Sequence, residues 1–316
     1  MNVSRRVLNG VFFSSLAMNL LLLVKHRRTK HFVSPSTQNI PEEGERQELS
    51  HIVIPFHWKD VGEVEKTIRS WGETRPCFPG DGAPRPSVLF YSSDDIRRTD
   101  RIEDMEGRIN AAVSALPVSV LGCFCGFEIR HANLTQRHEI YYEGKRLMLE
   151  KLIKGKTESS VPFRYVFYMD TATVAIRGGW IAALSEKIKH PNEPFWMKGS
   201  SYRGSDKNVM LMKETALQKM NGNAIYNLSA EDGFKAFFER MLKPYVLRRE
   251  QSNRRDFDSD FYDFLHDLEQ LKKTRKIMHK FVYTELIQDH SRSSYRVGNM
   301  LEKYPETYFV HGGYPR

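Results

Sequence analysis

An acidic residue, Asp170, stands where a short apolar and aromatic stretch gives way to a turn. The stretch 164–169 (RYVFYM) has the composition of a buried strand and is too short for a free-standing helix. After the turn-rich stretch 176–179 (IRGG), apolar residues recur from Trp180 onward on one helix face. The order strand, acid, loop and helix predicts that Asp170 lies at the carboxyl end of a strand, where ligands bind in open α/β sheets. An acid there holds a metal or a sugar hydroxyl, or it only caps a turn or a helix.

The second candidate for chemistry is His311, in the aromatic-rich tail 308–314. The two glycines that follow it and the aromatic residues around it are typical of a docked segment, whereas a frayed terminus would leave His311 exposed. A carboxylate and an imidazole, with further oxygens from a diphosphate, suit Mn²⁺ or Mg²⁺. A metal held by Asp170 and His311 would neutralise the charge of a departing pyrophosphate.

Other polar side chains follow predicted strands or a predicted turn. Lys198 and Arg203 come just after a strand, where they would clamp phosphates or form a solvated rim. The Asn-Gly turn at Asn221 brings further polar groups, so Asn221, Asn223 and Tyr226 would read hydroxyl groups or simply build the turn.

Two helices add candidates of a different kind. Tyr142 and Arg146 precede the central strand on a predicted helix, from which they would reach a nucleotide or pack on the helix surface. Asp258 and Asp260, in the charged stretch 248–260, would serve as a general base for a hydroxyl acceptor or as a charged lead into a helix.

The elements that must position these residues alternate between strand and helix. In the amino-terminal half we expect strands at 51–57, 88–91, 118–124 and 163–169, and helices at 61–71, 101–115 and 138–154. This alternation predicts an α/β fold with a mostly parallel central sheet flanked by helices. Beyond Asp170 we expect strands at 194–199 and within 220–228, and helices at 234–241 and 261–271.

The amino terminus differs from the rest of the chain. Residues 7–24 carry no charge and just reach the length of a membrane-spanning helix, weakened by polar residues within the stretch. We therefore expect a cytosolic tail and uncleaved signal anchor over 1–30, a stem over 31–50 and a folded domain over 51–316; a cleaved signal peptide is the alternative. Four basic residues follow the span and two precede it, which argues against a lumenal carboxyl terminus.

The charge and the cysteines restrict the partners and the compartment. Six of the nine net positive charges lie in residues 1–30, which indicates a membrane flank and argues against binding of nucleic acid by the folded domain. Cys77 would bridge to Cys123 or to Cys125 in an oxidising compartment, or all three remain buried thiols. The triplets at Asn133 and Asn227 are acceptor sequences for N-glycosylation if the domain is lumenal.

Several blocks together resemble a known family. These are IVIPFH in the first strand, the aromatic strand that ends at Asp170, IRGGW, FWMKGSSYRG, NGNAIYNL and the terminal VHGG, of which the fourth and fifth are the most specific. The sequence over roughly 51–316 is similar to nucleotide-sugar-dependent glycosyltransferases of the GT-A fold, in particular to a group from plants, algae and other microbial eukaryotes.

The resemblance implies a type II, membrane-anchored transferase of the Golgi or the endoplasmic reticulum with a lumenal catalytic domain. A UDP- or GDP-sugar would bind over the amino-terminal half of the sheet. A glycan or glycoprotein hydroxyl would bind at the carboxyl-terminal half, where Trp196 of the FWMKGSSYRG block joins the three residues of the Asn-Gly turn.

One position departs from the family pattern. Where these enzymes usually carry an Asp-x-Asp motif for a metal, this chain has Asp170-Thr171-Ala172, so the second acid is missing. Three options stay open: a metal held by Asp170, His311 and phosphate; metal-independent transfer with Lys198 or Arg203 carrying the charge; or an inactive relative that binds glycans or scaffolds other transferases. The basic flank after the span motivates one further hypothesis, a membrane protein that faces the cytosol.

Overall fold

The computed structural model of the chain describes residues 48–135, 142–155, 162–189, 194–204, 219–228, 233–249, 257–291 and 293–315. The expected membrane span at 7–24 and nearly all of the stem lie outside these residues. Within them, no helix combines the length and the apolar character that crossing a bilayer requires.

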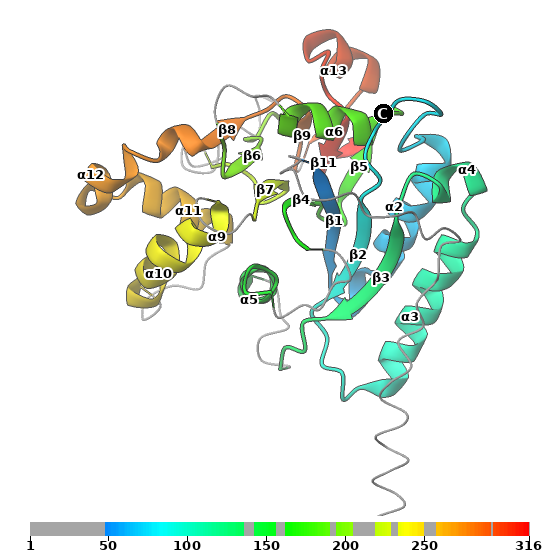
Figure 1. The fold of residues 1–316 in the computed structure, drawn as a ribbon, viewed down its shortest axis with the longest axis horizontal. Helices are drawn as coiled ribbons and strands as arrows, with labels where there is room; N and C mark the ends of the chain where they lie inside the picture. Colours follow the sequence, from blue (N-terminus) through cyan, green and yellow to red (C-terminus); the bar gives the residue numbers. More distant parts are fainter. Residues whose placement is uncertain are drawn as a thin grey trace, which may run out of the picture. The chain divides into compact units, whose positions relative to one another are not determined.

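A seven-stranded sheet, with strand order β3-β2-β1-β4-β7-β6-β8, forms the centre of the fold (Figure 1). The four strands of its amino-terminal half are mutually parallel, β7 runs antiparallel to β4 and to β6, and β8 is parallel to β6. The strands are β1 (Leu49–Phe56), β2 (Ser87–Ser92), β3 (Gly126–His131), β4 (Tyr165–Tyr168), β6 (Met197–Gly199), β7 (Ala224–Asn227) and β8 (Phe281–Tyr283). The expectation of a mostly parallel α/β sheet flanked by helices is confirmed.

Helices cover both faces of this sheet, so its central strands are apolar along their whole length. In β1, Ile52 and Ile54 face one apolar core and Val53 faces the other. The first core is completed by α2 (Val61–Glu73), α3 (Thr99–Ser114), α4 (Val118–Leu121) and α6 (Trp180–Lys189). Figure 1 shows α2 and α3 on one side of the sheet and α5 with the later helices on the other.

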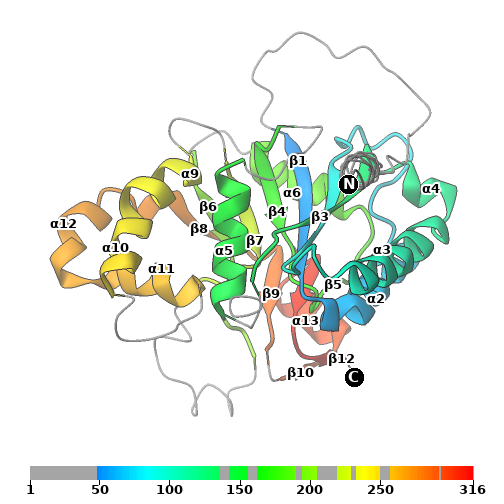
Figure 2. The same ribbon diagram turned by 90° about the horizontal axis from the view of Figure 1, so that it is seen from below.

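The second core lies under the helices of the carboxyl-terminal half and α5 (Figure 2). Its packing is dominated by aromatic rings: Phe237 contacts Phe234, Phe261, Phe264 and Phe281 at centroid distances of 5.1 to 5.8 Å. The helical segments are α5 (Tyr142–Ile153), α9 (Phe234–Phe237), the π-helical turn η2 (Phe238–Leu242), α10 (Lys243–Arg249), α11 (Phe257–His266) and α12 (Leu271–Thr274). Single 3₁₀ turns are η1 (Trp58–Asp60), η3 (Leu268–Gln270) and η4 (Met278–Lys280).

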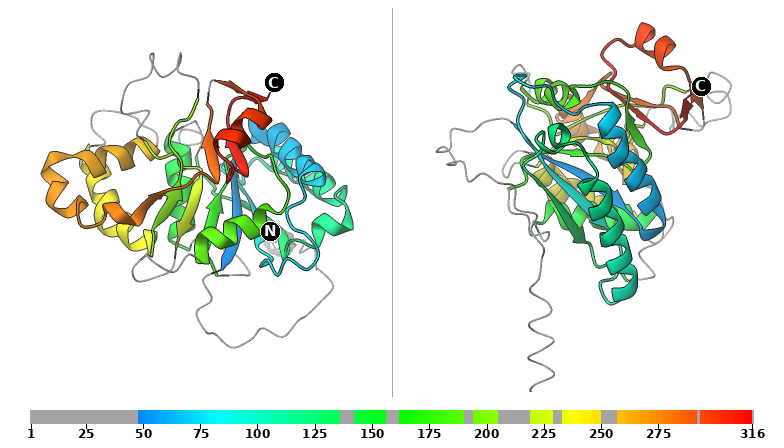
Figure 3. Two further views of the ribbon diagram at one scale, coloured as in Figure 1. Left: turned by 90° about the horizontal axis from the view of Figure 1, so that it is seen from above. Right: turned by 90° about the vertical axis from the view of Figure 1, so that its right-hand side faces the viewer.

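A second, three-stranded sheet joins the tail of the chain to the segment after Asp170. Its strand order is β5-β11-β9, with β5 (Thr173–Ala175) antiparallel and β9 (Ile287–Asp289) parallel to β11 (Phe309–His311). Helix α13 (Val297–Lys303) packs on it through Met300, and β10 (Ser294–Tyr295) pairs with β12 (Tyr314–Pro315). Figure 3 shows α13 projecting from the main sheet. The expectation that the tail is docked is therefore confirmed.

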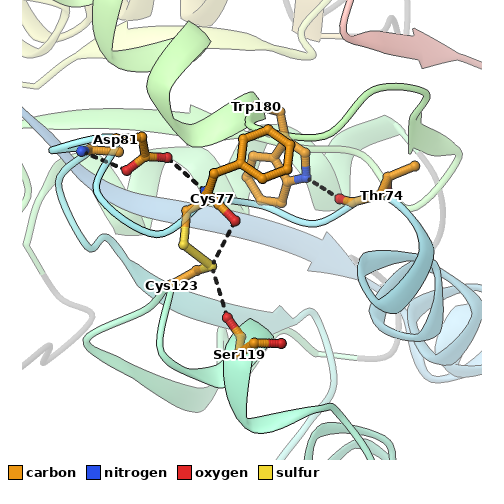
Figure 4. Close-up of a disulfide and its surroundings, with 8 residues drawn as sticks. Thr74, Cys77, Asp81, Ser119, Cys123 and Trp180 are labelled. Atoms are coloured by element: carbon orange, nitrogen blue, oxygen red, sulfur yellow. Dashed lines mark hydrogen bonds between the residues drawn. A yellow bond between two sulfur atoms is a disulfide. The ribbon is translucent and has the colours of Figure 1, made fainter.

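A disulfide joins Cys77, in the loop after α2, to Cys123, directly after α4 (Figure 4). Of the two partners that the sequence left open for Cys77, the structure selects Cys123, and Cys125 is an exposed thiol. The loop also fixes the start of α6, because Gly179 N–H donates to Arg75 O and the Trp180 indole donates to Thr74 O. The disulfide loop therefore holds the IRGGW segment in place.

The expectation of a strand at 118–124 is wrong. Pro117 opens the short helix α4 there, and the edge strand β3 follows at Gly126–His131. The error has a physical cause: β3 is half-buried along its whole length and carries the ion pair Glu128–Arg130, so its sequence lacks the apolar run of an inner strand. The strands of the small sheet β5-β11-β9, each of three residues, were not anticipated either.

His51 predicts a pH dependence of stability. It lies on β1 with an exposed fraction of 0%, and burial, opposed by Glu128, lowers its pKa from 6.5 to about 4. As the pH falls from 6.5 toward 4 the unfolded chain binds a proton that native His51 does not, so stability falls by up to roughly 3 kcal/mol. Urea unfolding at pH 7 and pH 4.5 will show that the free energy of unfolding falls less between these pH values in His51→Gln than in the wild type. His279→Gln, at an exposed position, is the control, and equal losses in all three proteins would contradict the prediction.

The ring of Phe78 lies against Gly178, one of the two glycines that precede α6. A Cβ on Gly178 would lie 2.8 Å from Phe78 Cζ. Gly178→Ala will lower the free energy of unfolding by up to about 1 kcal/mol, because the Phe78 ring, which is 49% exposed, must turn aside, and by less in a Phe78→Ala background. Gly72→Ala in α2, where a Cβ meets no atom within 4 Å, will cause no loss. If denaturant unfolding shows that Gly178→Ala lowers the free energy of unfolding as much in the Phe78→Ala background as in the wild type, the Phe78 ring is not the cause.

Candidate functional site

Asp170 lies directly beyond the carboxyl end of β4, as the sequence predicts. The chain forms β1, β2 and β3 toward one edge of the sheet and then places β4 on the other side of β1. In α/β sheets ligands bind at this topological switch point, outside the carboxyl ends of the two strands where the order reverses. Asp170 and the segment His57–Trp58 after β1 flank that point.

The Asn-Gly turn lies next to Asp170. Strand β7 pairs with β4 so that Ala224 is opposite Tyr168, which places the residues before Ala224 beside the residues after Tyr168. The side-chain Oδ1 of Asn223 accepts from the backbone N–H of Asp170 at 3.3 Å. The side-chain Oδ1 of Asn221 accepts from the backbone N–H of Asn223 at 2.8 Å. The Nδ2 of Asn223 is buried and has no hydrogen-bond partner in the described part of the chain, so one donor remains for a ligand.

A second carboxylate, Asp289 at the end of β9, is linked to the same turn. Its Oδ2 accepts from Asn221 Nδ2 at 3.0 Å, and its Oδ1 accepts from the N–H and the hydroxyl of Ser291 at 3.0 and 2.6 Å. Asp289 is 8% exposed. Hydrogen bonds therefore connect Asp170, through both asparagines, to Asp289.

His311 completes this group from the tail of the chain. On β11 it is paired with Asp289 on one side and with Thr173 on the other. Both ring nitrogens of His311 are buried and have no hydrogen-bond partner among the residues that the structure describes, and the Thr173 hydroxyl has none there either. An imidazole with two unpaired nitrogens contributes little to folding and is available to a ligand.

Asp170 carries its charge because of its neighbours. Burial by itself would raise the pKa of Asp170, but the ammonium of Lys145 on α5, the nearby His311 and the Ala172 N–H together lower it to about 2. Lys145 Nζ donates to Asp170 Oδ2, and the two side chains are 55% and 21% exposed. Lys145 is therefore a cation on the solvent side of the site, where it is accessible to a ligand.

The protein supplies few of the ligands that a divalent metal needs. Among the residues that the structure describes, no three His, Cys, Asp or Glu side chains come together as a metal-binding group. Asp170 Oδ2 is engaged by Lys145, Oδ1 accepts from Ala172 N–H and the Thr171 hydroxyl, and Ala172 offers no side-chain ligand. Asp170 and His311, the pair expected to bind Mn²⁺ or Mg²⁺ together with diphosphate oxygens, lie close to each other, so the protein itself would supply two of the ligands.

Two of the other expected binding residues, Lys198 and Trp196, lie away from this site. Lys198, on β6, points to the α6 side, where its Nζ donates to Lys187 O and lies 4.2 Å from the Phe195 ring centroid. Trp196 stacks on Phe237 at a centroid distance of 5.3 Å, against the second core. A third, Tyr226, is 1% exposed and supports the Asn-Gly turn, because its hydroxyl donates to Gly222 O.

The remaining candidates lie around the rim. Arg203 has an exposed side chain, and its backbone N–H donates to Asp289 O. Arg146 is half-buried on α5 next to Lys145, while the side chain of Tyr142 lies outside the described part of the chain. Asp258 and Asp260 begin α11, and Asp258 forms an ion pair of 3.1 Å with Lys219, two residues before Asn221.

A further set of unpaired polar atoms lies on the other side of the switch point, after β1 and β2. Asp94 is fully buried, and its Oδ2 accepts from Trp58 N–H at 3.0 Å. Its Oδ1 forms an ion pair of 3.9 Å with Arg101 Nη1 but has no hydrogen-bond partner within the described ranges. The hydroxyl of Ser93 is also buried and has no partner in these ranges. The guanidinium of Arg101 lies over the Trp58 ring at 4.3 Å. This second group offers stacking and a hydrogen-bond acceptor to a ligand.

Sequence reasoning missed Lys145 and Asp289. Asp289 ends the stretch Leu286–Asp289, so the pattern of a short apolar run closed by an acid, which identified Asp170, applies to it as well. Nothing in the local sequence distinguishes Lys145 from Arg146 next to it. Only the packing of α5 decides which of the two reaches Asp170.

Comparisons with known proteins give similarities of fold only. No protein-family model matches the sequence, and a comparison with curated proteins finds no match. Among solved structures, the galactosyltransferase LgtC in complex with donor and acceptor sugar analogues matches with a TM-score of 0.47 and 13% identity, over 83% of this chain and 86% of that one. Mouse xyloside xylosyltransferase 1 matches with a TM-score of 0.44 and 10% identity, over 83% and 97%.

The Mn/GDP form of core-mannan synthase A from Aspergillus fumigatus matches with a TM-score of 0.38 and 8% identity, over 81% of this chain and 80% of that one. Two of the three are named as glycosyltransferases and the third as a mannan synthase. At such identities and TM-scores, these matches carry no conclusion about the activity of this chain.

Because the ring of His311 has no hydrogen-bond partner among the described residues, we expect it to contribute more to ligand binding than to stability. His311→Leu will change the free energy of unfolding by less than about 1 kcal/mol, because the variant loses an electrostatic interaction with Asp170 but no hydrogen bond to the described residues. Asn227→Leu, a change of similar shape, will lower it by about 1–3 kcal/mol, because Asn227 Nδ2 donates to Phe195 O and to Tyr165 Oη. Denaturant unfolding of both variants measures the contrast, and an equal loss in both would assign His311 to the structural framework.

Proposed function

We propose that this chain is a glycosyltransferase that moves a sugar from a nucleotide-sugar donor, a UDP- or GDP-sugar, to a hydroxyl of a glycan or glycoprotein. The observation that carries the proposal is the group at the switch point of the sheet, where Lys145, Asp170, Asn223 and His311 converge. A cation, an imidazole with both nitrogens unpaired and an unused amide donor are the groups that a diphosphate and sugar hydroxyls require.

The two groups of polar atoms would bind different parts of the donor. The base and ribose of the nucleotide would lie toward Trp58 and Asp94, which offer an aromatic face and a buried carboxylate oxygen. The diphosphate would lie toward Lys145, and the sugar beneath it toward Asn223, Asp289 and His311. A nucleotide sugar laid along the carboxyl ends of β1 and β4 therefore meets stacking, charge and hydroxyl-reading groups in the order in which its own parts occur.

In the transfer itself, the bond from the anomeric carbon to the diphosphate oxygen breaks and a bond to the acceptor oxygen forms. The diphosphate leaves with the electron pair, and Lys145 stabilises its negative charge. The hydroxyl proton passes to Asp258 or Asp260 of α11, which we propose as the base. Arg203 on the rim would assist the diphosphate, whereas Lys198 has its ammonium directed toward Lys187 O.

A single cation in place of a metal agrees with the residue at position 172. One carboxylate and one ammonium balance in charge, as two carboxylates and one divalent ion do. Because Ala172 removes the second carboxylate, Lys145 can supply the positive charge without leaving an unbalanced acid. We therefore propose that the donor binds without a metal.

The lumen of the Golgi or the endoplasmic reticulum is the proposed compartment, with the uncharged stretch 7–24 as a type II anchor. Support comes from the Cys77–Cys123 disulfide, because disulfides persist in oxidising compartments and are rare in the cytosol.

The test is calorimetric binding of UDP and GDP to the purified chain in EDTA and in Mn²⁺. We expect binding in EDTA, weakened roughly ten- to hundredfold by Lys145→Met through loss of a charge-assisted contact. Lys198→Met is the matched control and will bind as the wild type does, because its ammonium lies on the opposite face of the sheet. Release of UDP or GDP from a panel of nucleotide sugars then measures turnover.

Two outcomes would contradict the proposal in different ways. Binding that requires Mn²⁺, is lost in Asp170→Ala and is unchanged in Lys145→Met would show that a metal, and not Lys145, supplies the positive charge for the diphosphate. Nucleotide binding without turnover of any donor would favour the non-catalytic glycan-binding or scaffolding protein over the transferase.

A further inference from the structure

Two of the acceptor triplets for N-glycosylation, Asn133-Leu134-Thr135 and Asn227-Leu228-Ser229, begin in described parts of the chain, and the fold treats them in opposite ways. A third triplet, Asn2-Val3-Ser4, precedes the uncharged stretch 7–24. We propose that Asn133 carries an N-linked glycan and that Asn227 carries none. This proposal requires the lumenal location but is independent of the transferase activity.

Asn133 is exposed and lies two residues beyond the edge strand β3. Its backbone has a φ of 51°, a left-handed conformation that asparagine tolerates better than most residues. The residues on either side are fixed, since Ala132 N–H donates to Ser92 O and Leu134 N–H donates to Ser93 O. The triplet therefore presents its asparagine outward from an ordered turn.

The hydrogen bond that Asn133 makes is compatible with a glycan. Its side-chain Oδ1 accepts from the backbone N–H of Ile96 at 3.3 Å. N-glycosylation uses the other side-chain atom, Nδ2, and leaves Oδ1 as a carbonyl oxygen. The turn can therefore keep this bond after modification.

Asn227 is in the reverse situation. It is 6% exposed on β7, which lies between β4 and β6 in the main sheet. Its Nδ2, the atom that would carry the sugar, donates to Phe195 O at 3.2 Å and to Tyr165 Oη at 3.5 Å. A glycan on Nδ2 would need space inside the core, so a chain modified at Asn227 would not reach this fold.

The Cys77–Cys123 disulfide supports the lumenal location that this modification needs. Disulfides are typical of oxidising compartments, and in eukaryotic cells such a compartment also contains the enzyme that glycosylates asparagine. The disulfide and the exposed triplet therefore agree on the lumen.

The modification itself transfers an oligosaccharide from a lipid-linked diphosphate. The bond between the anomeric carbon and the diphosphate oxygen breaks, the Asn133 Nδ2–carbon bond forms, and the lipid diphosphate leaves with the electron pair. The amide proton passes to a base of the modifying enzyme.

The glycan would sit at the same edge of the sheet as the candidate site. Carboxyl ends of parallel strands share one edge, and β3 is three strands from β4, roughly 14 Å at the usual strand spacing. A glycan at Asn133 would therefore lie beside the outer end of the surface toward which we place the nucleotide base.

The test is expression of the full chain in eukaryotic secretory cells, with its mass compared before and after treatment with peptide N-glycosidase F. We expect one shift, with the treated peptide carrying Asp in place of Asn133 in mass spectrometry. The shift will disappear in Thr135→Ala and remain in Thr135→Ser, which preserves the triplet. It will also remain in Ser229→Ala.

Three results would overturn the proposal. The first is a wild-type chain that contains the Cys77–Cys123 disulfide and shows no shift. The second is a glycan on Asn227 in folded protein. The third is a chain with neither glycan nor disulfide, which would place the domain in the cytosol. Because mass is the readout, each result is independent of whether the chain binds a nucleotide sugar.

Discussion

Strand β7 runs antiparallel to β4, with Ala224 opposite Tyr168, and the candidate site depends on this pairing. Because the two strands run in opposite directions, the residues that precede β7 lie next to the residues that follow β4. The Asn221–Asn223 turn therefore contacts Asp170, and through Asn221 it also reaches Asp289 of the small sheet. A parallel strand at this position would have sent its preceding turn to the far edge of the sheet.

The small sheet β5-β11-β9 extends this arrangement to the end of the chain. Strand β5 follows Asp170 by three residues, and its pairing with β11 brings the tail back to the same place. His311 thus arrives with both ring nitrogens unpaired, beside two carboxylates of which one is bound to Lys145. Buried polar atoms without partners cost free energy, so their concentration around one carboxylate is better explained by a ligand than by folding.

The other end of the Asp170 segment is held by the disulfide loop. The Cys77–Cys123 bond fixes the loop after α2, and this loop accepts hydrogen bonds from Gly179 and Trp180 at the start of α6. The stretch between Asp170 and α6 is therefore anchored at both ends, by sheet pairing and by a covalent link. Such anchoring supports a site whose geometry exists before the ligand binds.

Much of the amino-terminal half could be predicted from sequence. The strand that ends at Asp170, the strands β1 and β2 and the helices α2 and α3 follow from local apolar patterns, because burial on one or both faces acts on each segment separately. The edge strand β3 was misplaced because half-burial leaves no such pattern.

The side chains that reach the site were decided by the tertiary structure. Lys198 lies in a recognisable strand, but its register opposite Ile225, which packs in the first core, turns it toward α6. Lys145 reaches Asp170 only because α5 packs beside β4, and Asp289 is brought in by three-residue strands that carry too little local signal. The sequence by itself determined which segments are buried and where a carboxylate ends a strand, since these depend on neighbours along the chain. Which cation faces that carboxylate, which cysteine pairs with Cys77 and which asparagine stays exposed were settled by contacts between distant segments.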